Sequence, residues 1–219
     1  AHVGMCTENG WMPLHLAAQN GNERIANALL ERRAQSDARH NAGATALHLA
    51  AQNGCERVAE LLLDHRADAD AAGPGGTTPL HMASQNGHEG VARALLDRGA
   101  DVRVQIPGSW SGLMLAARNG HAVVAALLLE RGAPPDTKLK RHWTALHFAC
   151  QYGHPEVVRT LIEGGADPDP DAAVQLTPEG DGGRRRRETR SATTPMSLAA
   201  KHGHEIVVAV LRAHNALVS

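Results

Sequence analysis

The stretch TPLHMASQNG, residues 78–87, decides the fold of this protein. Thr78 is a residue type that caps the start of a helix, and Pro79 suits the first helical position, where its missing N–H costs nothing. Gly87 is suited to end the same helix, because glycine adopts a left-handed conformation without steric cost. The stretch therefore predicts a short helix that begins at Pro79 and ends before Gly87.

A second short helix is predicted directly after this glycine. Val91, Leu95 and Leu96 form an apolar stripe that the first helix can cover. Gly99 supplies a left-handed residue after the second helix, and ADVRVQIPG, residues 100–108, then turns back as an extended finger. Neither helix is stable alone, so we expect stacking between neighbouring units to complete the core.

The same phrase recurs along the chain at a fixed period. Its leucine lies every 33 residues, and the sixth copy follows after 50 residues: Leu14, Leu47, Leu80, Leu113, Leu146 and Met196. TPLHMA at 78–83, TALHLA at 45–50 and TALHFA at 144–149 resemble the T-P-L-H-x-A phrase of the ankyrin repeat. The resemblance covers essentially the whole chain.

This resemblance implies an all-α solenoid of six helix-turn-helix units with extended finger loops. We expect a single ankyrin-repeat domain over residues 1–219, with repeats at roughly 2–34, 35–67, 68–100, 101–133, 134–166 and 167–216. A 17-residue finger insertion, rich in Pro, Gly and charge, is expected within roughly 171–192. Ala1 falls in register with Ala34, so we expect the chain to be a fragment of a longer ankyrin-repeat protein.

Two repeats depart from the pattern at the end of the second helix. Arg33 and Arg66 stand where Gly99 stands in repeat three. If the left-handed conformation is kept, each arginine costs about 1 kcal/mol of stability.

Composition favours many small interfaces over one large core. The 219 residues are 42% hydrophobic but only 2% aromatic, and the net charge is −1. Three widely spaced cysteines, Cys6, Cys55 and Cys150, indicate neither a disulfide framework nor a zinc cluster, which favours an intracellular location, cytoplasmic or nuclear. No apolar run approaches the roughly 18 residues that span a bilayer, so no membrane contact is expected.

Eight histidines recur in repeated positions and invite a metal or catalytic interpretation. His15, His48, His81 and His147 lie at multiples of 33 residues, so stacking places them one repeat apart, too distant for three to share a zinc ion. The resemblance implies that these four hydrogen-bond backbone groups, and a structural role is also expected for His88, His121, His154 and His204. No catalytic set or phosphate loop stands out. We therefore expect no enzyme activity, no cofactor and no metal.

All three tryptophans, Trp11, Trp110 and Trp143, stand just ahead of the first-helix phrase. In the family, partners usually contact the concave face, which is built from finger tips and first helices. Further candidate contacts within the first helices are Gln52, Asn53, Gln85, Asn86, Arg118, Asn119, Gln151, Tyr152 and Lys201. Trp110 and Trp143 are expected on adjacent repeats beside Tyr152 as a binding hot spot. The alternative is that each tryptophan only covers its own helix.

Basic residues supply a second candidate surface. The insertion carries Arg184, Arg185, Arg186 and Arg187, and the preceding finger carries Lys138, Lys140 and Arg141. Three alternatives stay open: a loop that neutralises its own charge, an acidic protein partner, or nucleic acid and nuclear import.

The sequence therefore predicts a non-catalytic protein-interaction scaffold that binds a protein or peptide, with an acidic partner among the alternatives. The alternative is a regulatory or substrate-recruiting region of a larger signalling enzyme, such as a kinase or a ubiquitin ligase. Direct binding of nucleic acid is disfavoured by the nearly neutral net charge.

Overall fold

The computed structural model describes residues 4–139, 142–168 and 194–218. These residues form six pairs of antiparallel α-helices. The first member of each pair is α1 (Pro13–Gln19), α3 (Ala46–Asn53), α5 (Pro79–Asn86), α7 (Gly112–Asn119), α9 (Ala145–Tyr152) or α11 (Pro195–Lys201). The second member is α2 (Glu23–Glu31), α4 (Glu56–Asp64), α6 (Glu89–Asp97), α8 (Ala122–Glu130), α10 (Pro155–Glu163) or α12 (Glu205–Val218). The all-α solenoid predicted from the sequence is confirmed.

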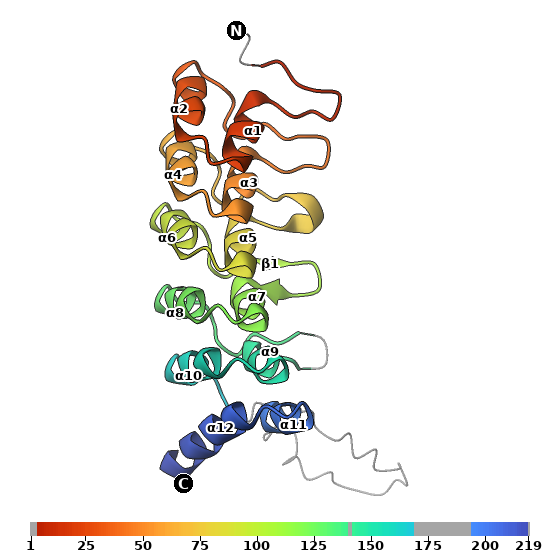
Figure 1. Ribbon diagram of the computed structural model, residues 1–219, viewed down its shortest axis with the longest axis vertical. Helices are drawn as coiled ribbons and strands as arrows, with labels where there is room; N and C mark the ends of the chain where they lie inside the picture. Colours follow the sequence, from red (N-terminus) through yellow and green to blue (C-terminus); the bar gives the residue numbers. More distant parts are fainter. Residues whose placement is uncertain (1–3, 140–141, 169–193, 219) are drawn as a thin grey trace, which may run out of the picture.

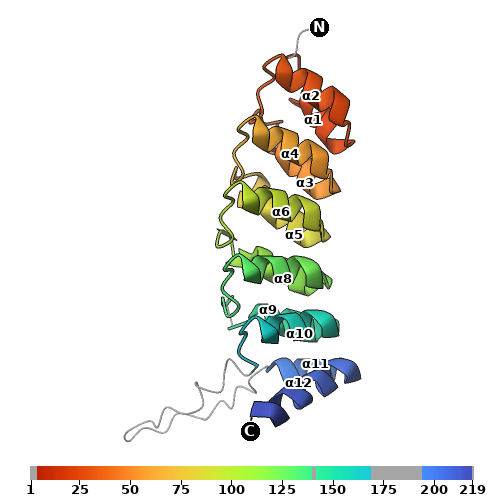
Figure 2. The ribbon, with the colours of Figure 1, turned by 90° about the vertical axis from the view of Figure 1, so that its left-hand side faces the viewer.

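The helix pairs stack in two columns, and the two ends of the chain lie at opposite ends of the stack (Figure 1). We call α1, α3, α5, α7, α9 and α11 the inner helices, and the other six the outer helices. Each inner helix packs on the next inner helix, and each outer helix packs on the next outer helix (Figure 2). The core is therefore a series of interfaces between neighbours, which makes stability a sum of unit and interface terms.

The fingers project to one side of the inner helices (Figure 1). One finger contains the 3-10 turn η1 (Pro74–Gly76). The next contains a short antiparallel hairpin of β1 (Gln105–Ile106) and β2 (Trp110–Ser111), in which Ile106 pairs with Trp110. This hairpin places Trp110 immediately before α7.

Histidine side chains close the starts of four inner helices. In α3, Nδ1 of His48 accepts the backbone N–H of Thr45 at 3.3 Å, and its Nε2–H donates to the carbonyl of Thr77 in the next finger at 3.0 Å. This satisfies backbone groups that a helix start leaves unpaired. Repeat four has Met114 in the histidine position, so α7 keeps only the hydroxyl part of the cap. The Ser111 hydroxyl accepts the Met114 N–H at 3.3 Å, as the Thr45 hydroxyl accepts the His48 N–H in α3.

A second set of histidines joins consecutive repeats at the turn between inner and outer helix. Nε2–H of His88 donates to the carbonyl of Gln52, one repeat earlier, at 3.1 Å. A Cβ on Gly54 would lie 2.6 Å from the His88 ring, so the glycine also makes room for it. His121, His154 and His204 make the same contact at 3.0–3.1 Å. The structural role predicted for these histidines is confirmed.

Both arginines at the ends of outer helices adopt the left-handed conformation, which meets the condition that the sequence left open. The φ angle is 62° at Arg33 and 62° at Arg66, and it is 89° at Gly99 in the matching position. Because a residue with a side chain is strained at positive φ, we expect each arginine to lower the stability of its repeat.

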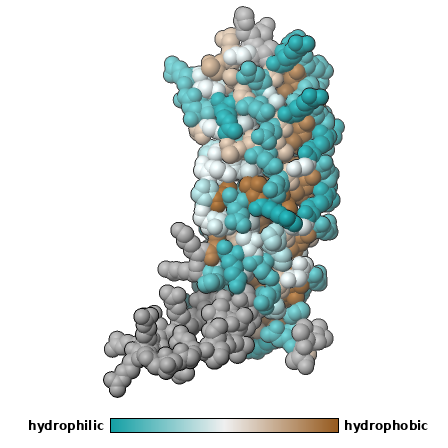
Figure 3. Space-filling model, turned by 180° about the vertical axis from the view of Figure 1, so that it is seen from behind, coloured by the Kyte–Doolittle hydropathy of each residue, from teal (hydrophilic) through white to brown (hydrophobic). Residues whose placement is uncertain are grey.

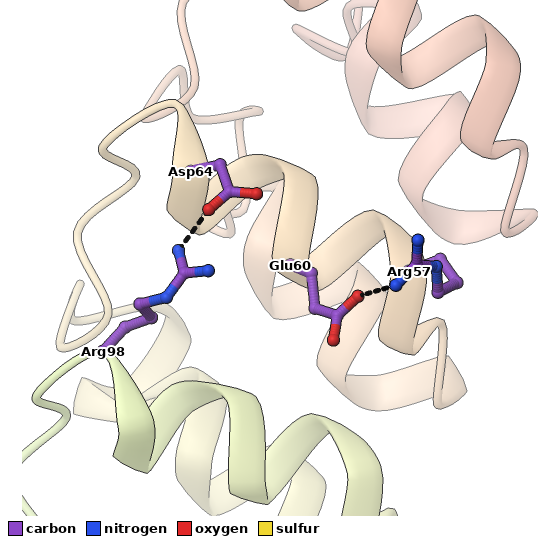
Figure 4. A network of polar contacts seen from close by, with 4 residues as sticks. All are labelled: Arg57, Glu60, Asp64 and Arg98. Atoms are coloured by element: carbon purple, nitrogen blue, oxygen red, sulfur yellow. Dashed lines mark hydrogen bonds and ion pairs between the residues drawn. The ribbon is translucent and has the colours of Figure 1, made fainter.

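Ion pairs cross between repeats on the outer helices. Arg98 lies 2.5 Å from Asp64, while Arg57 and Glu60 pair within α4 (Figure 4). In the next repeat, Arg131 lies 2.7 Å from Asp97. These side chains are between about one-third and two-thirds exposed to solvent, so each pair contributes less than about 1 kcal/mol. Seen from behind, hydrophilic residues follow the edge of the outer helices, and hydrophobic residues appear only in separate patches (Figure 3).

Candidate partner-binding surface

Two tryptophans from adjacent repeats pack on one phenylalanine. The ring centroids of Trp110 and Phe148 lie 4.7 Å apart with planes tilted by 33°, and those of Trp143 and Phe148 lie 5.1 Å apart edge to face. Phe148 is only 7% exposed, whereas both tryptophans keep part of their surface in solvent. The buried ring therefore fixes two partly exposed ones, an arrangement that presents rigid apolar area at little entropic cost.

An arginine extends this group along the inner helices. Arg118, in the last turn of α7, has its guanidinium carbon 5.7 Å from the Trp110 ring centroid and 5.6 Å from the Tyr152 ring centroid. Both distances lie within the range of a cation–π contact. Tyr152 is 43% exposed and Arg118 is exposed, so the two side chains lie on the surface. We call Trp110, Arg118, Trp143, Phe148 and Tyr152 the aromatic cluster.

Phe148 is the member that sequence reasoning missed. It stands in the register of Leu16, Leu49, Met82 and Leu115 on the inner helices. The available signal in the sequence is that the only phenylalanine of the chain stands five residues after Trp143, in the repeat that follows Trp110. From sequence alone, Phe148 is an ordinary apolar residue of the repeat, because its contact with Trp110 depends on where the neighbouring finger lies in space.

Trp11 lies apart from the aromatic cluster, at the other end of the stack. Its ring stacks on His40 of the next finger, with centroids 4.9 Å apart and planes 5° apart, and meets His15 edge to face. Trp11 therefore connects two neighbouring repeats through histidine rings and contacts no other tryptophan among the described residues.

The candidate asparagines of the inner helices bond to carbonyl groups of their own helices. The side-chain amides of Asn53, Asn86 and Asn119 donate to the carbonyls of Leu49, Met82 and Leu115, respectively, at 2.9–3.0 Å. These asparagines are exposed to solvent, and each amide also forms a hydrogen bond within its own helix.

The other polar candidates on the inner helices differ in exposure. Gln52, Gln85 and Lys201 are exposed, and Gln151 is half-buried. For Gln52 and Gln85 the described part of the chain shows a bonded backbone carbonyl but no bonded side chain.

The basic surface falls mostly outside the described residues. Lys138 is exposed on the finger before α9. Lys140, Arg141 and the insertion residues Arg184, Arg185, Arg186 and Arg187 all lie outside the residues that the structure describes, so the predicted patch remains a prediction.

Burial shifts the pKa values of several titratable groups in the core. Desolvation lowers the pKa of His15, His48 and His81, and backbone carbonyls partly oppose this shift. Burial also raises the pKa of the Cys150 thiol to about 12, which keeps it protonated and unreactive. These groups are therefore held in their neutral forms inside the stack.

The described side chains contain no group of three or more His, Cys, Asp or Glu that could hold a metal ion. Within the same ranges, no helix is long and apolar enough to cross a membrane. The aromatic cluster offers groups for stacking, apolar contact and charge-assisted hydrogen bonds.

Comparison with protein families identifies the architecture. A family model described as ankyrin repeats (3 copies) matches residues 1–72, 37–106 and 103–172. No curated protein matches the sequence. Ankyrin repeats are generally protein–protein interaction modules and are typically non-catalytic. With the family model covering most of its length and helix pairs stacked in register, the chain belongs to the ankyrin-repeat family.

Proposed function

We propose that this chain is a non-catalytic interaction scaffold that binds a protein partner through its inner helices and fingers, with the aromatic cluster at the centre of the contact. The observation that carries the proposal is the placement of two partly exposed tryptophans, an exposed tyrosine and an exposed arginine on two adjacent repeats. Tryptophan, tyrosine and arginine are the residues that most often dominate binding energy at interfaces.

The rest of the proposed surface is polar and extends over the neighbouring repeats. It includes the exposed side chains of Gln52, Gln85, Lys138 and Lys201. A polar rim around an aromatic centre excludes water from the contact without adding much energy of its own. The helix pairs of residues 1–219 are proposed to act as one domain, since each pair packs on the next.

An intracellular location is part of the same proposal. Cys6, Cys55 and Cys150 are all free thiols, as expected of a protein that works in a reducing compartment.

Photo-crosslinking from two positions of one repeat tests which face binds. A photoreactive amino acid replaces Gln85 on α5 in one variant and Arg93 on α6 in the other, and both side chains are exposed. We expect a partner from cell extract to crosslink from position 85 and not from position 93. Crosslinking from position 93 alone contradicts the proposal.

The identity of the crosslinked protein separates two versions of this function. A partner that is modified by a kinase or ubiquitin ligase joined to this chain would favour substrate recruitment. A partner that is held without modification would favour a scaffold.

A further inference from the structure

The inner helices carry positive charge and no negative charge. Their described sequences contain no Asp or Glu, and their only Lys or Arg residues are Arg118 and Lys201. Every outer helix, in contrast, contains at least one acidic residue. The inner helices are therefore positively charged, although the net charge of the whole chain is −1.

Arg118 is held in place by rings rather than by a carboxylate. Its guanidinium lies between the rings of Trp110 and Tyr152, at 5.7 and 5.6 Å from their centroids. Within the part of the chain that the structure describes, no ion pair involves Arg118. The N–H groups at its edge are therefore available to a ligand, and the stacked side chain has less rotational freedom to lose on binding.

Carboxylates on the nearby fingers are already engaged. Asp70 accepts the backbone N–H of Asp101, and Asp136 accepts the backbone N–H of Asp167. These carboxylates keep their negative charge, and Asp101 offsets the charge of Arg103 on the finger that leads to Trp110. The preference for an acidic ligand therefore rests on Arg118 itself, which has no ion pair among the described residues and lies on an inner helix without Asp or Glu.

We propose that Arg118 binds the carboxylate of an aspartate or glutamate in an extended acidic segment of the partner protein, with an apolar side chain of that segment packed on Trp110 and Trp143. A planar guanidinium accommodates a carboxylate through two parallel hydrogen bonds, which gives the contact geometric specificity. This inference rests on the proposed binding through the inner helices and names the chemistry that the surface selects.

Repeats one, two, three and five supply the conservative variant, since each carries glutamine in the register of Arg118: Gln19, Gln52, Gln85 and Gln151. Arg118→Gln therefore removes the charge with a residue that the fold accepts at this position. Arg24→Gln makes the same change on the exposed surface of α2 and serves as the matched control. Arg118→Lys keeps the charge but removes the planar group.

The test is selection of random 12-residue peptides displayed on phage against the intact chain and the three variants. We expect wild type and Arg24→Gln to enrich peptides that combine Asp or Glu with an apolar residue, and Arg118→Gln to lose this enrichment. For a synthetic peptide of the enriched sequence, Arg118→Gln should weaken binding roughly tenfold at low salt, with a smaller ratio at high salt. Arg118→Lys should fall between the two.

The outcomes separate this inference from the function on which it rests. Enriched neutral or basic peptides that still crosslink from position 85 would overturn the acidic segment and leave inner-face binding intact. Acidic peptides that bind Arg118→Gln and wild type equally would overturn the role of Arg118. Enrichment of no peptide by any form of the chain would count against both proposals.

Discussion

The carboxylate of Asp70 accepts the backbone N–H of Asp101, one finger further along, with each carboxylate oxygen 3.1 Å from the nitrogen. Burial raises the pKa of Asp70, and the hydrogen bond from Asp101 opposes that shift. The contact joins the bases of two fingers and recurs from Asp37 to Asp68 and from Asp136 to Asp167. It therefore fixes the spacing of consecutive repeats from the finger side.

This hydrogen bond cannot form between repeats four and five, because neither the aspartate acceptor nor a backbone N–H donor is present in the matching positions. Arg103 stands in the acceptor register and Pro134 in the donor register. Because proline has no N–H, no backbone donor is left without a partner at this position. We expect the double variant Arg103→Asp/Pro134→Asp to form the missing bond. In a double-mutant cycle of urea unfolding, the pair should show a stabilising coupling of about 1 kcal/mol. A coupling near zero would mean that these fingers are spaced differently.

The arginines at positive φ predict a gain in stability. Arg33→Gly and Arg66→Gly should each raise the free energy of unfolding by up to about 1 kcal/mol, because glycine adopts φ near 62° without strain. The matched reverse change, Gly99→Arg, should lower it by a similar amount, since Gly99 has a φ of 89° and open space around a Cβ. Urea denaturation measures all three variants. Opposite signs would show that the arginine side chains contribute more than the backbone strain costs.

A buried hydroxyl predicts a second stabilising change. Ser84 in α5 is fully buried, and its Oγ has no hydrogen-bond partner among the described residues. Alanine stands at the matching Ala18, Ala51 and Ala117. Ser84→Ala should therefore raise the free energy of unfolding by about 1 kcal/mol, because it removes an unpaired polar group.

Ser111→Ala is the control for this hydroxyl, because the Ser111 Oγ caps α7 by accepting the Met114 N–H. It should lower the free energy of unfolding by about 1 kcal/mol. If both serine variants are destabilised, Ser84 has a bonding partner, such as a water molecule, that it loses.

The buried histidines predict loss of stability in acid. Burial holds the pKa of His15, His48 and His81 below 6.5 in the folded chain, whereas an unfolded histidine has a pKa of about 6.5. The unfolded state then binds protons first, so this contribution is complete above pH 6.5 and is lost as the pH falls below it. The urea midpoint should decline between pH 7 and pH 5.

His81→Met provides the control, since Met114 already fills the equivalent position in repeat four. It should reduce the pH dependence of the urea midpoint, whatever it does to stability at pH 7. An unchanged slope would show that the pKa of His81 is the same in the folded and the unfolded chain.

The tryptophans of the aromatic cluster predict a loss of affinity. Trp110→Ala and Trp143→Ala should each weaken partner binding by ~2 kcal/mol, because they present fixed apolar area at the centre of the surface. Trp11→Ala, which removes a ring stacked on His40 at the far end, should change affinity far less. Affinity is measured by calorimetry and stability by thermal melting. Affinity losses that merely follow the melting temperature would contradict a direct contact.

Most of the fold could be predicted from the sequence because its determinants are local. The TPLHMASQNG stretch places cap, proline and glycine within ten residues, and the 33-residue period repeats these signals along the chain. The left-handed arginines followed from register alone, since the glycine positions of other repeats reveal what the backbone requires there. Each of these inferences needs only near neighbours in sequence or the comparison of one repeat with the next.

Only the tertiary structure decided how the candidate surface is assembled. Trp110 and Trp143 meet through Phe148, and Trp110 and Tyr152 meet through Arg118. These contacts depend on how far one repeat is displaced from the next and on the rotamers of long side chains, neither of which the 33-residue period encodes. Sequence thus determined which residues share a register, and the packing of neighbouring repeats determined which of them touch.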